Sequence, residues 1–143
     1  MSASDFLDSN VLIYAYDPKD LRKASIARGL VEKALLGDGV ISVQVLAEFA
    51  ATLLHKLRPI VQPAAVTEIL DAMHSISIVK PEAGTVRRAV EAYEQYGVQF
   101  YDGMIIAAAE RAGCKKIWSE DLNAGQEYFG VKVENPFAWS PEK

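Results

Sequence analysis

The sequence predicts an α/β domain with a mostly parallel central sheet and helices on its faces. Short apolar segments, typical of buried strands, occur at residues 6–8, 40–42, 76–79, 116–118 and 131–133. Between them, apolar side chains recur every three or four residues, which is the spacing of a one-sided helix. Strands that alternate with helices along a chain are typical of a parallel sheet covered by helices.

The helical segments can be assigned in order along the chain. One follows the first strand and carries Val11, Leu12 and Ala15. Others are expected at residues 27–35, 46–57, 66–73, 83–93 and 105–112. Pro81 precedes the segment at 83–93 and Gly113 closes the segment at 105–112, as residues bordering helices commonly do. Helix therefore outweighs strand in the predicted fold.

Length and composition favour one domain over residues 1–143. The chain is 50% hydrophobic and 24% charged, which is ordinary for a globular domain. Its single cysteine, Cys114, excludes an intramolecular disulfide and is in keeping with a reducing compartment. The first residues have neither a basic flank nor a long apolar run, so we expect a cytoplasmic protein without a signal peptide or a membrane partner.

Three acidic residues follow predicted strands. Asp8 closes the first strand, Glu48 lies early in the helix after the second, and Asp121 comes three residues after Trp118, where the strand at 116–118 ends. The carboxyl ends of parallel strands form the usual ligand-binding edge of such a sheet. These side chains are therefore expected to meet at one edge.

Asp102 is a fourth candidate. It stands near the start of a helix and shares one face with Ile105, Ile106 and Ala109. A carboxylate on an otherwise apolar face is costly unless a charge partner or a metal ion compensates it.

The other three acids also have structural interpretations. Asp8 can cap the following helix, Glu48 can be a solvated first-turn acid, and Asp121 can belong to a polar turn. Brought together with Asp102, however, these carboxylates would raise one another's pKa unless cations lay among them.

A metal ion is the economical source of that charge. Carboxylate oxygens favour Mg²⁺ or Mn²⁺ over zinc, and the only two histidines, His55 and His74, lie in helical segments far apart. Such a site suits phosphoryl chemistry, in which bound ions activate a water and stabilise the leaving oxygen.

The net charge also bears on the choice of partner. With 15 Lys and Arg against 19 Asp and Glu, the formal charge is −4, which argues against a broad basic face for nucleic acid. Without the four candidate acids, 15 Lys and Arg stand against 15 Asp and Glu, so the rest of the chain is formally neutral. Divalent ions bound among them would cancel much of their charge, so the acidic balance does not exclude nucleic acid.

Four segments, in this order, resemble the PIN-domain family and specifically the VapC-type toxin ribonucleases of toxin–antitoxin pairs. They are residues 7–15 (LDSNVLIYA), 42–49 (SVQVLAEF), 101–109 (YDGMIIAAA) and 118–123 (WSEDLN). The resemblance implies a PIN-like three-layer α/β/α sandwich. It also implies a site that binds Mg²⁺ or Mn²⁺ through Asp8, Glu48, Asp102 and Asp121, with Asn10 and Ser119 supporting it by hydrogen bonds.

Two positions in these segments need comment. Gly103 departs from the family, which more often has alanine there. Glu120, beside Asp121, is an alternative or auxiliary metal ligand, and the sequence does not decide its direction.

The activity implied by the resemblance is endonucleolytic hydrolysis of RNA by a metal-activated water, without a covalent intermediate. The implied partners are an RNA substrate, a cognate VapB-like antitoxin that passes a segment over the site, and a second copy in a homodimer. Alternatives are a PIN nuclease of RNA processing outside a toxin–antitoxin pair, and a non-catalytic RNA-binding or protein-binding module.

Other classes of α/β protein fit the sequence less well. A receiver domain would need an acidic residue where residues 78–80 read IVK, and a haloacid-dehalogenase domain would need an Asp at Asn10. No GxGxxG or GxSxG motif is present. Candidate phosphate contacts, each better explained as a solvated charge, are Arg22, Lys23, Arg28, Lys56, Arg58, Arg87 and Arg88.

Overall fold

The structure, a computed structural model, describes residues 4–56 and 62–138. The elements in these ranges are, in chain order, β1 (Phe6–Leu7), α1 (Ser9–Tyr16), α2 (Leu21–Leu35), β2 (Val40–Ser42), α3 (Val43–His55), α4 (Pro63–Ala72), β3 (Ser77–Val79), α5 (Ala83–Tyr96), α6 (Phe100–Arg111), β4 (Lys116–Trp118), β5 (Glu127–Tyr128) and β6 (Val131–Glu134). Of the residues singled out from the sequence, Leu57 of the expected helix at 46–57 and Arg58 lie outside the described ranges.

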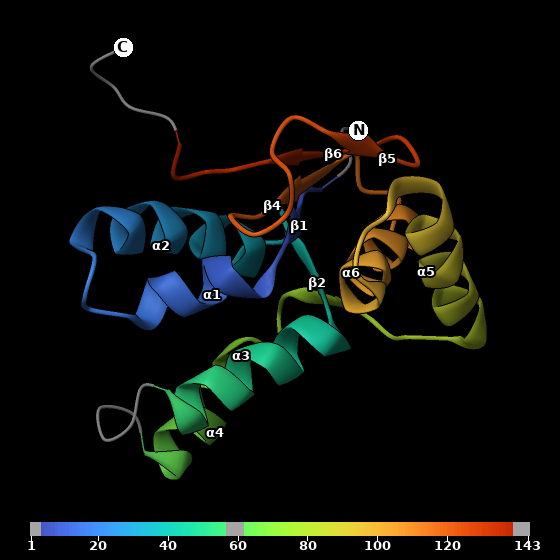
Figure 1. Cartoon of the computed structure of the whole chain (residues 1–143). Coiled ribbons are helices and arrows are strands. Elements are labelled where there is room, and N and C mark those ends of the chain that lie inside the picture. The colour runs from blue at the N-terminus through green and yellow to red at the C-terminus, as the bar shows by residue number, and fades with distance from the viewer. Residues whose placement is uncertain (1–3, 57–61, 139–143) are drawn as a thin grey trace.

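The strands form one sheet in the order β3-β2-β1-β4-β6-β5. Neighbouring strands are parallel except for β5, which runs antiparallel to β6. Helices α1 and α2 lie on one side of the sheet and α5 and α6 on the other, while α3 and α4 pack together and extend beyond the sheet (Figure 1). The predicted α/β fold with a mostly parallel sheet and covering helices is confirmed.

The antiparallel strand β5 was not predicted. It joins β6 through a two-residue turn in which Phe129 and Gly130 have φ of 53° and 81°. Two positive φ values suit the turns that connect hairpin strands, but a bulky residue such as phenylalanine rarely adopts one. The sequence at Phe129 therefore carries no recognisable hairpin signal. The Arg88 guanidinium lies 3.5 Å from the centre of the Phe129 ring and covers it.

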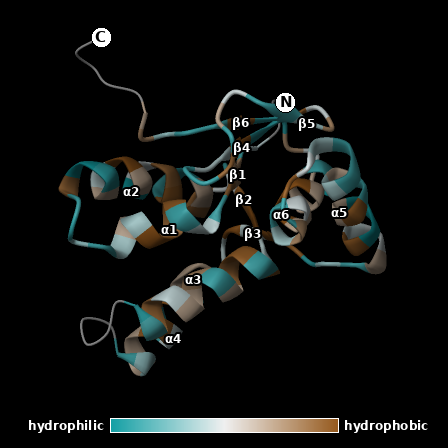
Figure 2. Ribbon diagram, viewed as in Figure 1, coloured by the Kyte–Doolittle hydropathy of each residue, from teal (hydrophilic) through white to brown (hydrophobic). Residues whose placement is uncertain are grey.

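The core lies between the sheet and its helices. Phe6 and Leu7 in the central strand β1 are buried, as are Ile41 in β2 and Ile117 in β4. In Figure 2, β1 and β2 are largely hydrophobic, whereas α2 and α5 alternate hydrophobic and hydrophilic segments. Parallel strands covered on both faces have this near-continuous apolar character. The residues that follow β1 and β4 are therefore anchored by a rigid core.

None of the helices in the described ranges is long and apolar enough to cross a bilayer.

Gly103 allows α6 to approach α5 closely. A Cβ atom at this position would lie 2.8 Å from the carbonyl oxygen of Ala89 and 3.2 Å from its Cα atom. Both are backbone atoms of α5, so relief would require the two helices to move apart. The departure from alanine at Gly103 is thus explained by helix packing next to Asp102.

We predict that Gly103→Ala destabilises the protein. Alanine is favoured over glycine in a helix by about 1 kcal/mol, but overpacking typically costs about 1–3 kcal/mol. Gly29, in the interior of α2 with open space around it, is the matched control. Chemical denaturation should show a lower free energy of unfolding for Gly103→Ala and a higher one for Gly29→Ala. Stabilisation by both substitutions would contradict the packing explanation.

Candidate active site

Asp8 stands where β1 ends and α1 begins. Its backbone N–H donates to the carbonyl of Trp118 at 3.0 Å, which continues the pairing of β1 with β4. Its carboxylate is buried, and Oδ1 accepts a hydrogen bond from the backbone N–H of Ser9 at 2.8 Å. Asp8 is therefore the cap of α1. The capping role and a role in the site are compatible, because Oδ2 faces the end of β4 instead.

Ser119 fixes that second oxygen. Its side chain is fully buried directly after β4, and its hydroxyl donates to Asp8 Oδ2 at 2.7 Å. The same hydroxyl oxygen accepts from the backbone N–H groups of Asp121 and Leu122 at 3.1 and 3.3 Å. Ser119 thus orders the loop that carries Asp121 and ties it to Asp8.

Asn10 completes this network from the first turn of α1. Its Nδ2 lies 3.4 Å from Asp8 Oδ2, 3.3 Å from Ser119 Oγ and 3.2 Å from Asp121 Oδ2. Its Oδ1 accepts from the backbone N–H of Glu120 at 3.1 Å. The buried amide therefore joins two carboxylates from different strand ends. This is the position that the resemblance implies for Asn10 and Ser119.

Glu48 and Asp102 approach from the helices α3 and α6. Gln44 links these helices, because its Nε2 donates to Glu48 Oε2 at 3.2 Å and to the carbonyl of Tyr101 at 3.1 Å. No role for Gln44 was expected from the sequence, although its position one helical turn before Glu48 is the signal that would have indicated a contact.

Glu48 and Asp121 act electrostatically on both Asp8 and Asp102. The pKa of Asp8 is raised to about 6, chiefly by burial and also by the charges of Glu48 and Asp121, while the hydrogen bonds from Ser119 and Ser9 oppose this rise. Burial also raises the pKa of Asp102, with added contributions from Asp121 and Glu48. The structure therefore brings Asp8, Glu48, Asp102 and Asp121 into one negative site.

The chemistry of this site suits a hard divalent cation. Within the described ranges, no lysine or arginine forms an ion pair with any of the four carboxylates. Nor does any group of three or more His, Cys, Asp and Glu side chains there have the geometry of a formed metal site. The donors are oxygens that repel one another, a set that a cation such as Mg²⁺ or Mn²⁺ would stabilise.

Glu120 points away from this site. Its carboxylate forms an ion pair with Lys23 of α2 and accepts a hydrogen bond from the hydroxyl of Tyr14 at 2.7 Å. Burial alone would raise the pKa of Glu120, but the hydrogen bonds from Lys23 and Tyr14 lower it overall. Glu120 therefore neutralises Lys23. Its side chain, whose direction the sequence did not decide, points away from the other four acids.

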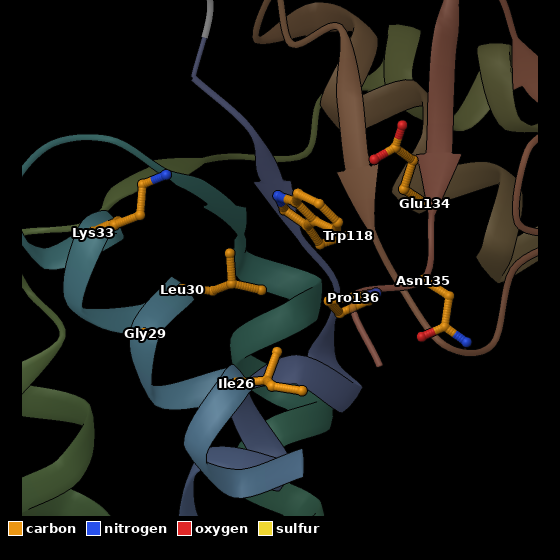
Figure 3. Close-up of a pocket in the computed structure, with 8 residues that line it drawn as sticks. All are labelled: Ile26, Gly29, Leu30, Lys33, Trp118, Glu134, Asn135 and Pro136. Carbon is orange, nitrogen blue, oxygen red and sulfur yellow. The ribbon is translucent and has the colours of Figure 1, made fainter. Parts of the chain in front are cut away.

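Two hollows in the surface differ in their relation to the site. One, of about 320 Å³, has Asn10 and Asp121 in its wall and opens directly beside the carboxylates. The other, of about 520 Å³, lies between α2 and the ends of β4 and β6, where Ile26 and Leu30 face Trp118 and Pro136 (Figure 3). None of the four carboxylates lines this larger pocket.

The sequence pattern of the PIN domain family matches residues 6–126, a range that includes all four carboxylates. The chain belongs to the PIN domain family. No curated protein is similar enough in sequence to match this PIN domain.

Solved structures show the same fold. A toxin–antitoxin complex from Klebsiella pneumoniae contains a chain 17% identical, with a TM-score of 0.69 over 93% of this PIN domain and 98% of that chain. A chain of DNA-bound VapBC from Salmonella typhimurium is 16% identical, with a TM-score of 0.67 over 94% of this PIN domain and 98% of that chain. VapC20 of Mycobacterium tuberculosis is a toxin that cleaves the sarcin–ricin loop. It is 16% identical, with a TM-score of 0.61 over 82% of this PIN domain and 90% of that chain.

We predict that the stability of the metal-free PIN domain falls as the pH rises from about 4 to about 6. In this window the unfolded chain releases the proton of Asp8, whose unperturbed pKa is 3.8, while the folded protein retains it because its pKa is about 6. The difference corresponds to about 3 kcal/mol at neutral pH. Asp8→Asn should therefore show a shallower decline in the free energy of unfolding.

Denaturation in EDTA at several pH values measures this difference. The exposed Asp71 provides a matched control, since Asp71→Asn should follow the wild-type curve. Parallel curves for the wild type and Asp8→Asn would show that Asp8 titrates alike in the folded and unfolded states.

Proposed function

We propose that this PIN domain is a metal-dependent endoribonuclease and the toxin of a toxin–antitoxin pair. The observation that supports the proposal most is the negative site itself. Four carboxylates from the end of β1, from α3, from α6 and from the β4–β5 loop lie at the carboxyl edge of the sheet, and Lys or Arg side chains of the described residues pair with none of them. A bound Mg²⁺ or Mn²⁺ would activate a water and stabilise the leaving oxygen of a phosphodiester.

The chain's own residues orient the ligands. Ser119 and Ser9 hold the two oxygens of Asp8, Asn10 holds Asp121, and Gln44 holds Glu48. Ligands fixed in this way lose little freedom when a metal ion binds.

The side chains present do not favour a covalent mechanism. The Ser119 hydroxyl is fully buried, and it is already engaged as a donor to Asp8 and as an acceptor from two backbone N–H groups. Cys114 is buried, and burial raises the pKa of its thiol to about 11, so its reactive thiolate form is suppressed. Hydrolysis by a water is therefore the reaction that the site supports.

The similar structures support the biological part of the proposal. VapC20 is a toxin that cleaves the sarcin–ricin loop, the chain from Klebsiella comes from a toxin–antitoxin complex, and the chain from Salmonella comes from DNA-bound VapBC. We accordingly propose an RNA substrate, a VapB-like antitoxin as the partner, a homodimer and a cytoplasmic location. Cleavage in RNA processing outside such a pair, or RNA binding without cleavage, is the alternative.

Purified protein should cleave RNA in the presence of Mg²⁺ or Mn²⁺ and should not cleave it in EDTA. Asp102→Asn and Glu48→Gln should each abolish cleavage, because each removes a ligand charge with little change in volume. Asp71→Asn and Glu68→Gln replace exposed carboxylates of α4 and serve as matched controls. RNA cleavage is followed by gel electrophoresis, and unfolding curves check that the variants fold.

Growth of a bacterial host that expresses the protein separates the alternatives. A toxin should arrest growth, Asp102→Asn should not, and a co-expressed antitoxin should restore growth. Normal growth with cleavage in vitro would indicate a processing nuclease. Near-normal cleavage by either site variant would contradict the proposed site.

A further inference from the structure

The hollow beside the carboxylates runs between two helices that both begin at the site. On α1, Asn10 lies at the site and Asp17 follows the end of the helix; on α3, Glu48 lies near the site and Lys56 follows the end. At 1.5 Å per residue, each helix extends about 10 Å away from the carboxylates. Residues along the length of α1 and residues from the far end of α3 line the hollow, so it leads outward from the site.

The far end of the hollow is basic. Lys19, in the connection between α1 and α2, and Lys56 both line it and are exposed. No ion pair joins either side chain to a carboxylate within the described ranges. Glu120, which also lines the hollow, is neutralised by Lys23. Asp17 also lines the far end, and its carboxylate accepts a hydrogen bond from the backbone N–H of Lys19. The hollow therefore has carboxylates of the site at one end and, at the other, two lysine ammonium groups against one carboxylate.

The walls between these ends are mixed in character. Ile13 and Tyr14 contribute apolar surface from α1, and Thr52 contributes a hydroxyl from α3. The volume of about 320 Å³ lies at the small end of the range for ligand pockets. A nucleoside combines a flat apolar base with a polar sugar, and it joins one phosphate to the next.

From this arrangement we propose that the hollow holds the nucleoside next to the scissile phosphate, with Lys19 and Lys56 binding the following phosphate. The inference rests on the proposed function, since the carboxylates would hold the scissile phosphate through metal ions. The base would pack against Ile13 and Tyr14. A protein segment would fit the apolar pocket of Figure 3 better, because the hollow offers charge at both ends.

The two lysines are tested together. Lys19→Ala with Lys56→Ala removes two exposed charges, and Lys33→Ala with Lys115→Ala is a control that changes the net charge equally. Lys33 near the end of α2 and Lys115 before β4 lie away from the carboxyl edge of the sheet. Binding of a labelled single-stranded RNA of mixed sequence is measured by fluorescence anisotropy in EDTA, so that no cleavage occurs.

The logarithm of the binding constant should fall less steeply with the logarithm of salt concentration in the lysine pair variant. Loss of the contact with that one phosphate reduces this slope by about 0.7 on a single strand between about 50 and 200 mM salt. The control pair should keep the wild-type slope. In Mn²⁺, the pair variant should raise KM for cleavage several-fold and leave kcat almost unchanged.

The nucleoside part is tested by filling the hollow. Thr52→Trp places a large ring in the hollow, whereas Thr67→Trp places the same ring on the exposed side of α4. The two positions are matched, because each threonine hydroxyl donates to the carbonyl four residues earlier in its own helix. Thr52→Trp should weaken RNA binding and Thr67→Trp should not.

The outcomes separate this inference from the proposed function. An unchanged salt slope in the lysine pair variant, or no RNA binding by the wild type in EDTA, would overturn the nucleoside site even if RNA is cleaved; a protein partner would then be the occupant to examine. A reduced slope without any metal-dependent cleavage would retain the nucleoside site as an RNA-binding feature and overturn the nuclease.

Discussion

The carboxylate of Asp8 must be held in place at the end of β1 although it is buried and feels the charges of Glu48 and Asp121. Moving such a group out of water is costly, and hydrogen bonds to its oxygens reduce that cost. Ser9 and Ser119 supply those bonds from two different segments of the chain. The rest of the site is arranged around this requirement.

The network around Asp8 also joins separate elements. Ser119 lies after β4 and Asn10 in α1, so the bonds that hold Asp8 fix the end of β4 against the start of α1. Asp102 is brought to the same site by α6, which can lie close to α5 because Gly103 has no side chain. Fold stability and site geometry therefore depend on the same few contacts. The folded protein keeps mutually repelling carboxylates together at the place where a metal ion would relieve the repulsion.

Much of this arrangement could be predicted from the sequence, because periodicity and strand order carry it. Asp8 and Asp121 follow buried strands, and parallel strands end at one edge, so their convergence follows from the topology. Asp102 stood out because an acid is unusual on an apolar helix face. The roles of these residues in catalysis stay predictions.

Other features depend on contacts that the sequence does not encode locally. The direction of Glu120 is decided by Lys23, far away in sequence, and the hairpin at Phe129 uses a backbone conformation that phenylalanine rarely adopts. The close approach of α5 to Gly103 and the position of the two lysines at the end of the hollow also depend on how the helices pack, so they could not be predicted from the sequence.

We propose that the Ser119 and Asn10 network presents carboxylates to a divalent cation. Calorimetric titration of the metal-stripped protein with Mn²⁺ measures this binding. The wild type should bind Mn²⁺, Ser119→Ala should bind it about 10–100-fold more weakly because a residue that orients a ligand has been lost, and Ser25→Ala, at an exposed position of α2, should bind it like the wild type. Equal affinity of Ser119→Ala and the wild type, or no binding of Mn²⁺ by the wild type, would contradict the claim.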